Sequence, residues 1–220
     1  MSSEGAVQPF EFVACLELRE MLGRVAWDER ELLAGIEDAP ADSLYYHTRS
    51  YFLRSRYLSA LYPNDFATWA AIQVRDRVLG ERLAVVDPFD FGDVELLRAD
   101  LISVIDAHLG SRGTVPRVDT GEPFHFMRST LIDVPATARA TTLEEFRDGL
   151  ARVDGSAIYY HFYEPARRRP EADPLRWLDA LGRHDVADRV RALHPSMSSL
   201  DGMRAELLAI CDQALGVHGA

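Results

Sequence analysis

The side chains best suited to chemistry occur in two identical triplets, Tyr45-Tyr46-His47 and Tyr159-Tyr160-His161. Histidine exchanges a proton near neutral pH, and a tyrosine hydroxyl donates hydrogen bonds or holds an anion. Helical spacing places His47 on the same face as Leu44 and Tyr51, and a histidine on an apolar face is more often packed in a core. The triplets therefore favour a structural role, with ligand contact second and catalysis third.

A second pair of candidates combines an aspartate with a tryptophan four residues later: Asp65 with Trp69, and Asp173 with Trp177. Pro174 follows Asp173, and proline at the first helical position marks Asp173 as an N-cap. We expect Asp65 to be an N-cap too. Each buried indole N–H needs an acceptor, for which the triplet histidine is a candidate. Structural roles are favoured here as well. The candidate ligand-binding residues are Tyr46, His47, Asp65, Trp69, Tyr160, His161, Asp173 and Trp177.

Metal-ligating side chains have a suitable spacing at one place, His161-x-x-Glu164. Metal sites in helix bundles use such an i,i+3 pair together with several further carboxylates. Ser50 stands 114 residues before Glu164, so the pair does not recur with the rest of the triplet region. It is weak evidence, and we expect no metal and no cofactor.

Composition excludes several classes of function. The net charge of −11 argues against a broad nucleic-acid or anionic-membrane surface. All 24 basic residues are arginine, so mechanisms that need a lysine amine are excluded. The run Arg167-Arg168-Arg169 can grip an anion or an acidic partner, although such a short run is usually solvated. Without a membrane-length apolar run or a signal-peptide pattern, we expect a soluble cytoplasmic protein.

The candidates recur because the sequence matches itself after a shift of 114 positions (124 − 10 = 114). Nine identities join residues 9–47 to 123–161. A repeat of this length predicts one structural unit used twice, with a pseudo-two-fold axis. We expect repeat unit one at 9–109, a linker at 110–121 and repeat unit two at 122–216. Whether the two pack as one globular domain is open.

Each repeat predicts a short strand region followed by four to five helices. Alternating aromatic residues begin the strands, which we expect to end near Leu18 and Val134. Capping boxes at 28–31 and 142–145 begin the next helix, and N-caps at Asp42 and Ser156 begin the one after. The predicted fold class is α+β and predominantly helical.

The chain resembles an uncharacterised prokaryotic family of domain-of-unknown-function proteins, number 5752. The resemblance extends from Phe10 to about Leu215. It implies the duplicated architecture and brings no established activity, cofactor or catalytic residue. The segments that carry it are Tyr45-Tyr46-His47-Thr48, Pro63-Asn64-Asp65-Phe66-Ala67-x-Trp69, Leu79-Gly80-Glu81-Arg82-Leu83-Ala84 and Phe124-His125-Phe126-Met127.

Two functions stay open. The first is a non-catalytic binding or scaffolding protein, which holds a protein or small molecule in a groove between the repeats or on an exposed aromatic face around Tyr51–Tyr62. The recurrence of caps, aromatic residues and a histidine, without convergent nucleophiles, favours it. The alternative is a hydrolase or lyase, metal-independent or metal-assisted, with His47 and His161 as acid and base beside Tyr46 and Tyr160 at the pseudo-two-fold axis.

Overall fold

The computed structural model describes residues 7–54, 62–111, 113–164 and 169–216. They form eleven α-helices, three short π- or 3₁₀-helical segments and one two-stranded sheet, which confirms a predominantly helical α+β fold. The chain divides into two compact units. Unit 1 comprises residues 1–16 and 132–220, and unit 2 comprises residues 17–131. No described helix is both long enough and apolar enough to cross a membrane.

The helices of each unit follow one another along the chain. Those of unit 2 are α1 (Glu29–Asp38), α2 (Ala41–His47), α3 (Ser50–Arg54), α4 (Asp65–Trp69), the π-helix η1 (Ala70–Val74), α5 (Arg77–Ala84) and α6 (Val94–Gly110). Those of unit 1 are α7 (Leu143–Arg152), α8 (Gly155–Phe162), η2 (Pro170–Ala172), α9 (Pro174–Ala180), α10 (His184–Arg191), η3 (Pro195–Met197) and α11 (Leu200–Ala214).

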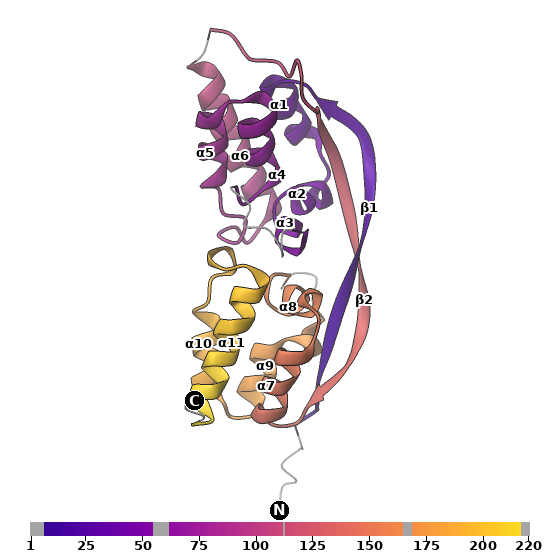
Figure 1. Ribbon diagram of the computed structural model, residues 1–220, viewed down its shortest axis with the longest axis vertical. Helices are drawn as coiled ribbons and strands as arrows, with labels where there is room; N and C mark the ends of the chain where they lie inside the picture. The colour runs from indigo at the N-terminus through magenta and orange to yellow at the C-terminus, as the bar shows by residue number, and fades with distance from the viewer. Residues whose placement is uncertain (1–6, 55–61, 112, 165–168, 217–220) are drawn as a thin grey trace, which may run out of the picture. The chain divides into compact units, whose positions relative to one another are not determined.

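The strands β1 (Phe10–Ala26) and β2 (Phe124–Ala140) pair with each other. They run in opposite directions, because β1 passes from unit 1 into unit 2 and β2 returns (Figure 1). The predicted ends near Leu18 and Val134 are wrong, since both strands continue to an alanine much further on. The later half of each strand is largely exposed, so backbone pairing extends it without the apolar pattern that sequence analysis relies on.

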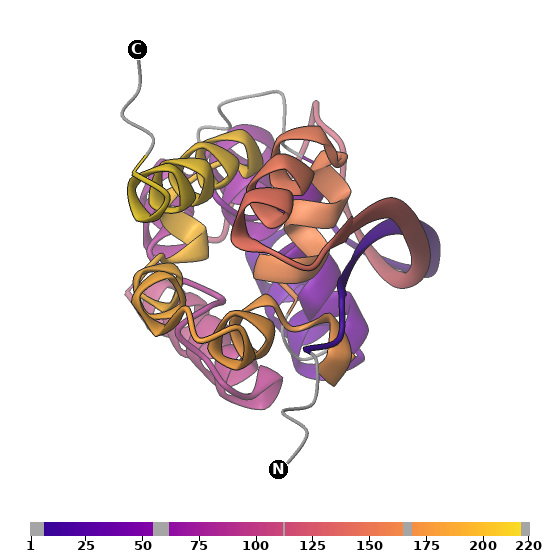
Figure 2. The same ribbon diagram turned by 90° about the horizontal axis from the view of Figure 1, so that it is seen from below.

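The beginning of β1 completes the core of unit 1. Phe10 and Phe12 are almost fully buried, and the Phe12 ring stacks on Phe146 of α7 at 5.5 Å between ring centroids. Around them α7 packs on α11, and Figure 2 shows these two helices side by side. The helices of the predicted second repeat are therefore completed by a strand of the predicted first repeat.

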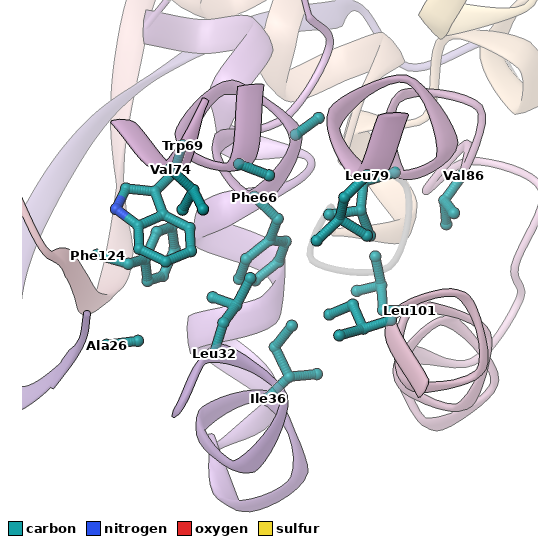
Figure 3. Packing of buried hydrophobic residues seen from close by; sticks show 14 of the residues in the cluster. Ala26, Leu32, Ile36, Phe66, Trp69, Val74, Leu79, Val86, Leu101 and Phe124 are labelled. Atoms are coloured by element: carbon teal, nitrogen blue, oxygen red, sulfur yellow. The ribbon is translucent and has the colours of Figure 1, made fainter. Parts of the chain in front are cut away.

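The beginning of β2 does the same for unit 2. Phe124 stacks on Phe66 of α4 at 5.2 Å between ring centroids. Figure 3 shows Phe66 in the middle of the core, near Leu32 and Phe124. Val118, in the predicted linker, is also buried in this core. The compact units thus differ from the segments 9–109 and 122–216 by an exchange of strand beginnings; the repeat boundaries, which concern sequence homology, stay a prediction.

The predicted helix starts are partly right. Asp28 and Thr142 are the N-caps of α1 and α7, as predicted. The N-caps predicted at Asp42 and Ser156 are wrong. Helix α2 begins after Pro40, and α8 begins after Asp154, whose carboxylate accepts from the Ser156 N–H at 2.9 Å and so caps the helix two residues earlier.

Two helical glycines allow the strand phenylalanines to lie against the helices. A Cβ atom on Gly149 would overlap the Phe12 ring, and one on Gly35 would overlap the Phe126 ring. We expect Gly149→Ala to lower the free energy of unfolding by about 1–3 kcal/mol, because overpacking exceeds the gain in helix propensity of about 1 kcal/mol. Urea denaturation measures the change. Gly110→Ala is the control, since nothing lies within 4 Å of its added methyl group. Equal effects of the two substitutions would contradict this packing.

Candidate functional site

Each unit has a pocket beside the helix that carries the predicted Asp–Trp pair. The pocket in unit 2 has a volume of about 280 Å³ and lies beside α4. The pocket in unit 1 has a volume of about 620 Å³ and lies beside α9. Both are lined by the tryptophan of the pair, and by the residues that lead into a strand. All four candidates of unit 2 line its pocket, whereas in unit 1 only Asp173 and Trp177 do, and Tyr160 and His161 do not belong to the lining.

His47 holds β2 against unit 2. Its ring is buried, and Nδ1 lies 2.9 Å from Asp65 Oδ2. On its other side, Nε2 accepts the Met127 backbone N–H at 3.0 Å. A carboxylate and an amide N–H on opposite sides define a neutral ring protonated at Nδ1. Burial lowers the pKa of His47, and the hydrogen bond to Asp65 opposes this only in part. Both nitrogens are thus engaged in holding the strand.

Asp65 is not the predicted N-cap. Asn64 takes that place and accepts the Ala67 N–H at 2.8 Å. The Asp65 carboxylate instead receives hydrogen bonds from His47 and from Arg54 Nη2 at 2.8 Å. Burial by itself raises the Asp65 pKa, but the His47 hydrogen bond and the Arg54 charge outweigh it and hold that pKa below its usual value. The hydrogen bonds from His47 and Arg54 thus explain why Asn64, and not Asp65, caps α4.

Sequence analysis missed Arg54. Its guanidinium carbon lies 4.1 Å from the centroid of the buried Tyr46 ring, and Nη2 also donates to the Tyr46 carbonyl at 2.7 Å. The available signal was its position only seven residues after His47, although α2 ends at His47 and Arg54 belongs to α3. Arg54 therefore connects Tyr46 to Asp65, which in turn binds His47.

His161 holds β1 against the helices of unit 1. Nε2 accepts the Val13 N–H at 2.9 Å, and Nδ1 lies 2.9 Å from the Ala172 carbonyl, to which it donates. Asp173 is the N-cap of α9, as predicted, and accepts the Leu175 N–H at 3.0 Å. Backbone groups therefore use both nitrogens of this ring. Glu164 accepts the Tyr159 hydroxyl, so the described contacts do not join it to His161 as a pair of metal ligands.

The tryptophans also bind the backbone. Trp69 Nε1 donates to the Glu122 carbonyl at 3.0 Å, and Trp177 Nε1 donates to the Gln8 carbonyl at 3.1 Å. The prediction that the triplet histidines accept these hydrogen bonds is wrong. The acceptors are backbone carbonyls that lie just before each strand. Each indole therefore fixes the segment that leads into its strand.

Tyr160 and Arg169, the last residue of the arginine run, contact the same carboxylate in unit 1. The Tyr160 hydroxyl donates to Asp133 at 3.1 Å, and Arg169 Nε lies 3.4 Å from the same carboxylate. Arg169 is therefore engaged in a local ion pair. Arg167 and Arg168 lie outside the described residues.

Comparison with known proteins identifies the family of the chain. The family of unknown function (DUF5752) matches residues 7–212. The chain belongs to this family. Among solved structures, this DUF5752 member is similar to one described as "The structure of OrfY from Thermoproteus tenax", with a TM-score of 0.75, 24% identity, and coverage of 95% of this chain and 96% of that chain. At this identity the likeness shows the fold alone. The comparison with curated proteins gives no significant match.

The stability of this DUF5752 protein should depend on pH through His47. Because its pKa is lower in the folded state than the ordinary 6.5, the folded state favours the neutral ring. That contribution is fully present above pH 6.5 and is lost as the pH falls toward the folded-state pKa. Urea denaturation between pH 5 and 8 should show this loss for the wild type and a smaller one for His47→Gln. An identical pH dependence in both proteins would contradict the assignment.

Proposed function

We propose that the protein is a non-catalytic binding protein that holds a small, partly apolar anion in the pocket of unit 1. Its volume of about 620 Å³ lies within the range of about 300–1,000 Å³ of small-molecule sites. Apolar residues such as Pro9, Pro170 and Trp177 line much of it. This pocket is the observation that carries the proposal.

One cation at the pocket, Arg176, favours an anion. Each carboxylate at the pocket contacts a nearby group of the protein. Glu11 pairs with Arg139 at 2.9 Å, and Glu171 lies 4.0 Å from Arg169. Asp173 caps α9. Arg176 also lines the pocket, is exposed, and has no ion pair among the described residues. A guanidinium beside apolar walls binds a carboxylate, phosphate or sulfonate group attached to an apolar body.

The triplets support binding over catalysis. General acid–base chemistry needs a ring nitrogen that can reach the reacting group. In His47 and in His161, both nitrogens instead hold backbone or carboxylate groups. A hydrolase or lyase that uses these rings would first have to release a strand, so we do not propose it.

The exposed aromatic face around Tyr51–Tyr62 is not part of this proposal. Tyr62 is buried, and residues 55–61 lie outside the described part of the chain, so an exposed aromatic face over Tyr51–Tyr62 gains no support. The pocket of unit 1 replaces that face in our proposal.

We further propose that the two pockets arose by internal duplication with pseudo-two-fold symmetry. Support comes from contacts that repeat at the shift of 114. His47 accepts from Met127 as His161 does from Val13 (127 − 13 = 114). The acceptors of the two indoles are also 114 apart, at Glu122 and Gln8 (122 − 8 = 114).

The test fills the pocket. Ala180 lines the pocket and is exposed, so Ala180→Trp should occupy the volume without disturbing the core. Ala209→Trp, on an exposed position of α11, is the matched control. The probe is anilinonaphthalene sulfonate, an apolar anion whose fluorescence rises on binding.

We expect saturable binding by the wild type and Ala209→Trp. Binding should be at least about tenfold weaker in Ala180→Trp and in Arg176→Gln, since Arg176→Gln removes a charge-assisted contact. Circular dichroism confirms that each variant is folded. Equal affinity in all four proteins, or no saturable binding by the wild type, would refute the proposal.

A further inference from the structure

Unit 2 contains a buried group of three metal-ligating side chains away from the pocket. His108 Nε2 lies 3.0 Å from Asp76 Oδ2 and 3.8 Å from Glu29 Oε2. One ligand atom from each of the three lies within 4.8 Å of the others. None of the three residues is more than 4% exposed. A nitrogen and two carboxylate oxygens therefore converge from segments far apart in the sequence.

Three different elements place these donors. Glu29 is the first residue of α1, and His108 lies in the last turn of α6. Asp76 is the N-cap of α5 and accepts the Leu79 N–H at 3.0 Å with its other oxygen, Oδ1. The chain reaches Asp76 through the π-helix η1 and through Arg75, which has a φ of +65°. An ion bound here would join α1, α5 and α6.

The donor set suits a divalent ion. Two carboxylate oxygens and one neutral imidazole nitrogen can all bind the same doubly charged cation. Buried charges are stable when they are paired or coordinate a metal. Arg82 Nη1 lies 3.5 Å from His108 Nδ1, but this arginine is exposed and lies at the limit of a hydrogen bond. Arg82 lies on the Nδ1 side of the His108 ring, and Nε2 faces the two carboxylates.

The fold does not require such a trio. In unit 1 the first residue of α7 is Leu143, the N-cap of α10 is Arg183 and the last residue of α11 is Ala214. These residues occupy the places of Glu29, Asp76 and His108 under the proposed duplication. Unit 1 builds its core without the three ligands, so their presence in unit 2 points to a separate task.

We propose that Glu29, Asp76 and His108 bind one divalent transition-metal ion as a structural site. Imidazole nitrogen with carboxylate oxygen is a donor set typical of Zn²⁺, and the carboxylates also suit Mn²⁺. Because all three donors are buried, the ion ties helices together and does not face a substrate. This inference is independent of the pocket in unit 1.

The test uses the full chain, freed of any purification tag, stripped with a chelator and dialysed. Isothermal titration with Zn²⁺, and separately with Mn²⁺, measures the affinity and the number of ions bound. Asp76→Asn removes the charge but keeps a side chain that caps α5, so it should fold. Glu29→Gln is the second variant. His184→Gln is the control for surface binding, because His184 is exposed and lies 3.0 Å from Asp179.

We expect one high-affinity ion per chain for at least one of the two metals, and a Tm that falls on chelation and recovers on adding it. Asp76→Asn and Glu29→Gln should weaken binding by about 100-fold or more, since losing even an outer partner of a ligand costs about 10–100-fold. His184→Gln should bind like the wild type. The proposal is wrong if the wild type binds neither metal, if Asp76→Asn binds as tightly as the wild type, or if binding is lost with His184→Gln.

Discussion

Removal of residues 1–16 is expected to unfold helices α7–α11 while α1–α6 stay folded. The deletion takes Phe10 and Phe12 from the core of unit 1, together with the backbone groups that His161 and Trp177 bind. Each buried phenylalanine contributes about 3–5 kcal/mol. The loss is comparable to the whole stability of a domain, about 5–15 kcal/mol. Unit 2 keeps all of its own residues, 17–131.

Amide hydrogen exchange followed by mass spectrometry measures this deletion helix by helix. A chain that begins at Val7 is the control and should keep full protection in both units. Adding a synthetic peptide of residues 7–16 should restore protection in α7–α11. Full protection of α7–α11 without residues 1–16 would show that the helices of unit 1 fold without the beginning of β1.

Replacing Asp65 by alanine is expected to lower the free energy of unfolding by about 2–3 kcal/mol. The substitution leaves His47 and Arg54 without their shared acceptor. Removing one partner of a fully buried pair costs about 3–5 kcal/mol, and the side chains of Arg54 and Asp65 keep 18% and 21% exposure, which reduces the effect.

Asp212→Ala is the matched control for this ion pair. Asp212 pairs with Arg147 at 2.8 Å, but the two side chains are 28% and 34% exposed and involve no buried histidine. We expect a loss below about 1 kcal/mol, as for other surface pairs. Urea denaturation of both variants at pH 7 gives the comparison. Equal losses would mean that the Asp65 network adds nothing beyond a surface ion pair.

Sequence patterns predicted three of the six expected helix N-caps correctly. The N-caps at Asp28, Thr142 and Asp173 follow from short-range hydrogen bonding, which a few neighbouring residues determine. Where two adjacent residues can both cap, as Asn64 and Asp65 can, local chemistry does not decide. The choice came from Arg54 and His47, whose proximity depends on the tertiary fold.

Long-range features were beyond the sequence. The alternation of Phe10 and Phe12 indicated a strand, but nothing local says which helices it contacts. The carbonyl acceptors of the two indoles and the trio around His108 were hidden for the same reason. A weak signal existed for the trio: Glu29 aligns with Leu143 under the shift of 114, a charge opposite an apolar residue.

The state of the triplet histidines tests whether they hold strands or perform chemistry. Two-dimensional ¹H–¹⁵N spectra of the imidazole rings report protonation and tautomer directly. We predict that His47 and His161 are both neutral and protonated at Nδ1 at pH 7, and that His47 stays neutral below its ordinary pKa of 6.5 because burial lowers that value. A His47 ring that titrates at or above 6.5, or either ring protonated at Nε2, would contradict the account and return the triplets to the list of catalytic candidates.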